Sequence, residues 1–188
     1  MSRLSDLLTA EARKRGLHGD RPLDPASAFA LVRDMPYRRA SDRKPETTIR
    51  EWRGTCSGKH YLLQAVLAEL GTKSDLMACT AYVEANPDSL PAELAEILRE
   101  GPVPDVHNYL RLPEIVDATW PLEAAAHGVP VNPDWTPGRD MKMPFNPISE
   151  IRVPDDVDAQ TFKDDLLREH FSREELDRRD RFFRALAG

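Results

Sequence analysis

Residues 54–71 read Gly54-Thr55-Cys56-Ser57-Gly58-Lys59-His60 and then YLLQAVLAELG. From Lys59 onward the apolar residues recur with the spacing of one helix face, at positions 62, 63, 66, 67 and 70. Gly71 predicts the end of this helix, because glycine adopts the left-handed conformation without a Cβ clash. Cys56 then falls in the first turn or at the cap, where unpaired backbone N–H groups and the helix dipole favour an anion. Since the thiolate is the reactive form of cysteine, this position predicts a reactive thiol.

Two later segments add polar side chains to predicted strands. Val106 to Leu112 alternates like a strand and carries His107 near its start, and Glu114 to Trp120 is predicted as the next strand, carrying Asp117. A cysteine on a helix, followed by a histidine and an aspartate on successive strands, resembles the transglutaminase-like superfamily of papain-fold thiol enzymes. The matching motifs lie between about residues 50 and 121: the Gly-x-Cys-x-x-x-x-x-Leu-Leu helix, the His-x-Tyr-x-x-Leu strand and the Val-Asp-Ala-Thr-Trp strand.

The resemblance implies an α+β fold in which the helix bearing the cysteine packs on an antiparallel sheet bearing the histidine and the aspartate. It also implies a triad: Cys56 as nucleophile, His107 as base, paired as thiolate and imidazolium in the resting enzyme, and Asp117 to orient the imidazole. The expected activity is acyl transfer from an amide, isopeptide or ester of a peptide, protein or small acyl substrate. No cofactor and no metal are expected.

The oxyanion of such a reaction needs hydrogen-bond donors. The backbone N–H of Cys56 is one candidate, and the second is left open between the Trp52 N–H and the Tyr37 hydroxyl. Some relatives carry a glutamine or tryptophan just around the cysteine, and this sequence does not.

Two other classes of function are weighed against the enzyme. The first is a catalytically silent module that keeps the fold and binds a peptide or protein partner. The second is a metal site, because cysteine, histidine and aspartate all bind zinc, but no His-x-x-His or Cys-x-x-Cys pair accompanies them. Next to Cys56, His60 is interpreted as a partly buried histidine bonded to a carbonyl or to water, and Lys59 is expected to point to solvent.

The triad also requires one particular strand register. His107 and Asp117 share a face of the sheet if the connection is an odd-length loop or contains a bulge, as when residues 112–114 form a three-residue loop and Arg111 lies opposite Ile115. Proline at 113 favours that loop, because it is poorly suited to the positive φ values of a two-residue hairpin turn.

Composition bounds the remaining possibilities. The chain has 188 residues and a net charge of −6, which argues against a nucleic-acid surface. It has no apolar run of membrane-spanning length and no signal-like apolar segment near Met1, so we expect a cytoplasmic protein that does not bind membranes. In a reducing cytosol Cys56 and Cys79 are expected to be thiols, with Cys79 buried in a strand at 75–83. The oligomeric state is left open.

One domain is expected over residues 1–188, with its core at about 25–121. Helices are expected at 2–15, 26–34 and 90–99. The basic residues 38–47 are interpreted as a solvated loop, or alternatively as an anion-binding rim beside the active site. A proline-rich extended segment at 121–154 should wrap the domain, either bordering the site or as a surface wrap without function. C-terminal helices are expected at 158–187, the last one opened by a capping box of Ser172 and Glu175.

Overall fold

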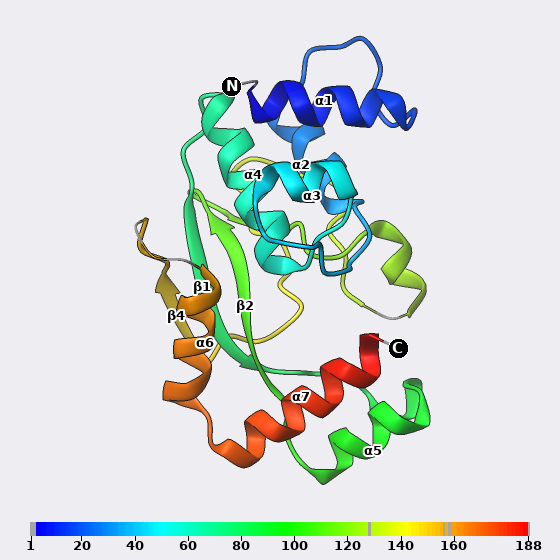
Figure 1. The fold of residues 1–188 in the computed structure, drawn as a ribbon, viewed down its shortest axis with the longest axis vertical. Helices are drawn as coiled ribbons and strands as arrows, with labels where there is room; N and C mark the ends of the chain where they lie inside the picture. Colours follow the sequence, from blue (N-terminus) through cyan, green and yellow to red (C-terminus); the bar gives the residue numbers. More distant parts are fainter. Residues whose placement is uncertain (1–2, 128, 156, 158, 188) are drawn as a thin grey trace. The chain divides into compact units, whose positions relative to one another are not determined.

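Four α-helices come first along the chain, then four strands with one α-helix between the first and the second strand, and then two final α-helices (Figure 1). The structure is a computed structural model that describes residues 3–127, 129–155, 157 and 159–187. Within this described part, seven α-helices and a four-stranded antiparallel sheet give the α+β class that the sequence predicts. The chain divides into two compact units, Met1–Met77 with Asn108–Met143 and Ala78–His107 with Pro144–Gly188.

The first unit is built around one central helix. Helix α4 (Cys56–Glu69) contacts α1 (Leu4–Lys14), α2 (Pro25–Arg33) and α3 (Pro45–Glu51). The apolar face predicted for α4 is buried against them, and Gly71, with φ of 85°, follows its end. Fully buried side chains fill the space between these helices: Leu8, Val32, Ile49, Leu62, Leu63, Val66 and Leu67.

Helix α3 differs from the sequence prediction. Residues 38–47 are expected to be irregular, but the helix already begins at Pro45, because proline is well suited to the first turn, where its missing N–H costs nothing. The helix ends at Trp52, which adopts the left-handed conformation with φ of 52°.

The sheet has the strand order β3-β2-β1-β4. Its strands are β1 (Asp75–Tyr82), β2 (Pro104–Arg111), β3 (Ile115–Val116) and β4 (Ser149–Arg152). Strands β2 and β3 pair with Arg111 opposite Ile115 and Leu110 opposite Val116, which confirms the predicted three-residue loop at 112–114. The Leu112 N–H donates to the Glu114 carbonyl at 2.9 Å and closes this loop.

Strand β3 is shorter than predicted, and Asp117 lies just beyond its end. The reason is local competition for backbone donors. The Thr119 N–H donates to Asp117 Oδ1 at 2.9 Å, and the Ala118 N–H donates to a histidine ring nitrogen. Because side chains take these two N–H groups, the hydrogen-bond ladder does not continue past Val116.

The second unit contains α5 (Ala92–Glu100), α6 (Ala159–His170) and α7 (Arg173–Ala187). Helix α7 packs on α5 around a cluster of Leu94, Ile97, Val103 and Phe182. The predicted capping box is confirmed: the Ser172 N–H donates to Glu175 Oε2 at 2.9 Å, and the Glu175 N–H donates to Ser172 Oγ at 3.3 Å. The predicted helix starts at Ser2 and Asp158 lie outside the described residues.

The described residues of the proline-rich segment 121–154 mostly lack regular secondary structure, apart from a short 3₁₀ helix, Leu122–His127, and one strand, β4. Its only described strand, β4, lies at an edge of the sheet, which agrees with the expectation that prolines exclude a central strand. None of the helices in the described ranges combines the length and apolar character needed to cross a membrane.

Candidate functional site

Cys56 is the first residue of α4, as its neighbours in the sequence predict. It follows the extended N-cap residue Thr55 and is 3% exposed. Its Sγ lies 4.0 Å from Ser57 Oγ, and that hydroxyl donates to Asn108 Oδ1 at 2.8 Å. The thiol therefore lies at the positive end of a buried helix, beside polar neighbours.

Lys59 is fully buried, so the expectation that it points to solvent is wrong. Its ammonium donates to the carbonyls of Arg33 at 2.8 Å and of Thr119 at 2.9 Å. Burial lowers the pKa of Lys59 to about 7, although the negative charges of Asp34 and Asp117 oppose this shift. The signal for its burial is present in the sequence, because position 59 precedes Leu62 and Leu63 by three and four residues and so falls on the apolar face.

His60 is also fully buried, and backbone groups occupy both of its ring nitrogens. The Ala118 N–H donates to Nε2 at 2.9 Å, which makes Nε2 an acceptor. Nδ1, 2.8 Å from the Cys56 carbonyl, then carries the proton, and the ring is neutral. The interpretation of His60 as a histidine bonded to a carbonyl is confirmed, with deeper burial than expected, and this arrangement leaves no nitrogen to act as a base.

Asp117 is held next to the beginning of α4 from several sides. Lys59 and His60 bind the backbone of Thr119 and Ala118, and His60 Nε2 lies 3.8 Å from Asp117 Oδ1. The proline-rich segment supplies two further contacts: the Asp117 N–H points to Met141 Sδ at 3.2 Å, and Asn132 Nδ2 donates to the Asp117 carbonyl at 3.1 Å. This segment therefore borders Asp117, a predicted site residue.

His107 lies in β2 and belongs to the second unit. It is 1% exposed, and its ring meets the edge of Phe145 with 5.5 Å between centroids. Its distances to Cys56 and Asp117 stay predictions.

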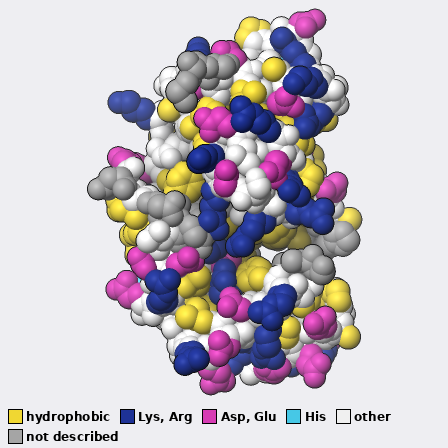
Figure 2. All heavy atoms as spheres, viewed as in Figure 1, with side chains coloured by type: hydrophobic (Ala, Val, Ile, Leu, Met, Phe, Trp, Pro, Cys, Tyr) yellow, Lys and Arg dark blue, Asp and Glu magenta, His cyan; other side chains and the backbone are white. Residues whose placement is uncertain are grey.

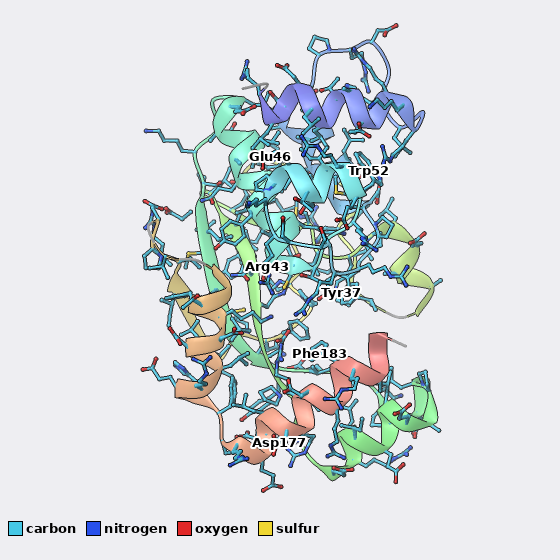
Figure 3. The ribbon with its side chains drawn as sticks, viewed as in Figure 1. Tyr37, Arg43, Glu46, Trp52, Asp177 and Phe183 are labelled. Atoms are coloured by element: carbon cyan, nitrogen blue, oxygen red, sulfur yellow. The ribbon has the colours of Figure 1, made fainter. Side chains whose placement is uncertain are left out.

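The two oxyanion candidates come from the segments before Cys56 and are labelled in Figure 3. The Trp52 N–H donates to the Ile49 carbonyl at 3.2 Å, so it is used in ending α3. Tyr37 forms a parallel β-bridge with Gly54, and its ring stacks on Trp120 with 4.2 Å between centroids. Trp120 Nε1 is buried without a hydrogen-bond partner in the described part of the chain, a donor that the sequence reasoning missed.

Cys79 is buried in β1, and neither cysteine forms a disulfide. Within the residues that the structure describes, no group of three His, Cys, Asp or Glu side chains is placed to hold a metal ion.

No protein family model, curated protein or solved structure matches this chain. Its function is therefore argued from the chemistry of the site.

Proposed function

We propose that the chain is a thiol-dependent acyl-transfer enzyme of transglutaminase-like type. In this proposal Cys56 is the nucleophile, His107 the base and Asp117 the carboxylate that orients the imidazole. The substrate is an amide, isopeptide or ester of a peptide, a protein or a small acyl compound, and the Cys56 thiol works in its reduced form.

One observation carries the proposal: the first two turns of α4 hold the nucleophile and the carboxylate in one buried cluster. Cys56 begins the helix, while Lys59 and His60, three and four residues later, bind the backbone on the C-terminal side of Asp117. A thiol at a helix N-terminus loses its proton more readily than an ordinary thiol. Two of the three proposed triad members are therefore held by the same helix.

The observed register of β2 and β3 supports the third member. Arg111 lies opposite Ile115 and Leu110 opposite Val116, where the pairing ends. Extended by one residue, the same alternation would bring Asp117 opposite Tyr109. His107 has the same parity as Tyr109 along β2, so the register is the one that the triad requires. A register shifted by one residue would argue against the triad.

The proposed reaction starts from the resting pair, in which the Cys56 proton is already on His107 and the two groups are a thiolate and an imidazolium. The thiolate forms a C–S bond with the acyl carbon, and the C–N or C–O bond breaks as the imidazolium returns its proton to the leaving group. Water or an amine then attacks the thioester, loses its proton to His107, and the C–S bond breaks to restore the thiol.

The oxyanion formed in these steps needs donors near the beginning of α4. The backbone N–H of Cys56 is the first. The Tyr37 hydroxyl and the Trp120 Nε1–H come from two stacked rings beside Gly54, and we propose this pair as the source of the second donor.

The test that needs no known substrate is alkylation of Cys56 by iodoacetamide across pH, read by mass spectrometry of the peptide. A thiolate that persists below about pH 6 supports the enzyme, because an ordinary cysteine titrates near pH 8.5. Cys79 of the same chain is the internal control. An ordinary titration of Cys56 would instead favour a catalytically silent binding module. This alternative has one observation in its favour, because Cys56 is only 3% exposed and a substrate must reach its sulfur.

A screen of peptide and ester substrates then tests the roles of the residues. Cys56→Ala should abolish activity, whereas Cys79→Ala should retain it. Asp117→Asn keeps the oxygen that accepts the Thr119 N–H but loses the charge, and for a triad carboxylate the rate can fall by up to about 10⁴-fold. Full activity of Cys56→Ala on a verified substrate would overturn the thiol mechanism.

A further inference from the structure

The segment between α2 and α3, continued into α3, carries basic side chains that have no carboxylate partner. Residues 38–50 contain five basic and two acidic residues in a chain whose net charge is −6. Within the described residues, no ion pair joins any of the five to an acid: Arg38, Arg39, Arg43, Lys44 and Arg50. We call these five side chains the basic rim. All are exposed except Arg43, which is half-buried.

Two of the acidic residues near the rim bind backbone N–H groups or other side chains. Asp42 accepts the Lys44 backbone N–H at 2.8 Å, and Glu51, just after the rim, binds Ser41 and the guanidinium of Arg53. Arginines of α7 behave differently, since Arg178 and Arg179 bind Glu174 and Asp105. The charge of Asp42 acts on Lys44, but with two acidic residues for five basic ones the rim is a local excess of positive charge.

The first residue of the rim, Arg38, directly follows a segment that pairs with the backbone just before Cys56. Tyr37 pairs with Gly54, two residues before Cys56, and the Gly54 N–H donates to the Pro36 carbonyl at 3.2 Å. In Figure 1 the loop between α2 and α3 runs past the beginning of α4, and Figure 3 labels Tyr37 and Arg43 on this loop. Figure 2 shows several Lys and Arg side chains where Figure 1 draws this loop and α3.

We propose that the basic rim binds carboxylate groups of the acyl substrate beside Cys56. The identification of the bound carboxylate as part of an acyl substrate rests on the proposed function. Guanidinium groups bind carboxylates through paired N–H donors, and their positive field raises the local concentration of anions. The net negative charge of the whole chain disfavours long polyanions such as nucleic acid, so the ligand is a short acidic segment.

Binding is measured first, by fluorescence anisotropy of a labelled glutamate-rich peptide and its glutamine-rich counterpart. Wild-type protein should bind only the acidic peptide, and Arg38→Ser/Arg39→Ser should weaken binding. The control, Arg3→Ser/Lys73→Ser, changes the net charge equally at the other end of α4, about 20 Å from Cys56 at 1.5 Å per residue. Equal loss of binding in both double variants would overturn the carboxylate proposal. Failure of the wild-type protein to bind the acidic peptide would overturn it as well.

Reactivity is measured next, as the ratio of Cys56 alkylation rates by anionic iodoacetate and neutral iodoacetamide. Two unit charges would change this ratio about fourfold at low ionic strength if each acted over about 10 Å in water. Arg38→Ser/Arg39→Ser should lower it, the control should not, and salt should remove the difference. If the protein binds the acidic peptide but its Cys56 titrates as an ordinary thiol, the rim proposal stands and the proposed enzyme function is wrong. If Cys56 is a reactive thiol but the rim variant leaves the alkylation ratio unchanged, the proposed enzyme function stands and the rim proposal is wrong.

Discussion

Lys59 in the first unit and Asp105 in the second are both buried charged side chains, but their surroundings differ. Asp105 Oδ1 lies 2.7 Å from the guanidinium of Arg179 and 3.1 Å from the ammonium of Lys163. Burial raises the pKa of Asp105, but the two positive charges outweigh it and hold the pKa below its usual value. Lys59 instead binds two backbone carbonyls, and burial lowers its pKa to about 7.

The difference separates a buried carboxylate that is fixed by ion pairs from a buried ammonium group that can lose its proton near neutral pH. Asp105 joins β2 to α6 and α7 and stays ionised at neutral pH. Lys59 can lose its proton near neutral pH, and it lies three residues from Cys56 with its charge also acting on Asp117. Strongly shifted groups of this second kind are typical of functional sites. The comparison therefore assigns a structural role to Asp105 and makes Lys59 a candidate for a role at the proposed site.

The largest expected effect is on the structural charge. Asp105→Asn leaves Lys163 and Arg179 without their shared carboxylate, and removing one partner of a buried pair costs about 3–5 kcal/mol of unfolding free energy. Urea unfolding at pH 7 measures the loss. Because the pKa of Asp105 is lowered in the folded state, the stabilisation is complete above about pH 4 and is lost as the pH falls through the folded value. A wild-type and variant difference that stays constant down to pH 2 would contradict this assignment.

The next effect concerns the pH dependence that Lys59 gives to stability. The unfolded chain keeps the lysine proton up to about pH 10, whereas the folded chain releases it near pH 7. The unfolding free energy of the wild type should therefore rise with pH in this range, relative to Lys59→Met, by up to about 1.4 kcal/mol per pH unit. Urea unfolding at several pH values measures both slopes. The exposed Lys73→Met is the control, and parallel curves for wild type and Lys59→Met would show that Lys59 does not titrate there.

Features that depend on neighbouring residues could be predicted from the sequence. The beginning of α4 at Cys56, its end before Gly71 and the three-residue loop around Pro113 follow from helix periodicity, glycine conformation and turn geometry. The register follows from the same turn geometry, because proline at 113 disfavours a two-residue turn and an odd-length loop changes which residues share a face.

Features that depend on distant partners could not be predicted. Lys59 can be buried because the carbonyls of Arg33 and Thr119 accept hydrogen bonds from its ammonium group. Those residues lie 26 and 60 positions away in the sequence. Strand β3 ends early because His60 takes the Ala118 N–H, 58 positions away. The cluster around Asp105 joins residues from β2, α6 and α7, and its members look like ordinary surface charges in the sequence. Only the periodicity of α4 points to one of these features, the burial of Lys59.

The smallest expected effect isolates burial as the cause of the contrast. Glu100 of α5 forms an ion pair with Arg181 of α7, so it joins the same helix that Asp105 joins, but both side chains are nearly half exposed. Glu100→Gln makes the same carboxylate-to-amide change as Asp105→Asn. Water and salt screen an exposed pair, so the urea midpoint should not move measurably at pH 7. If Glu100→Gln cost as much stability as Asp105→Asn, charge pairing alone, and not burial, would explain why Asp105 matters.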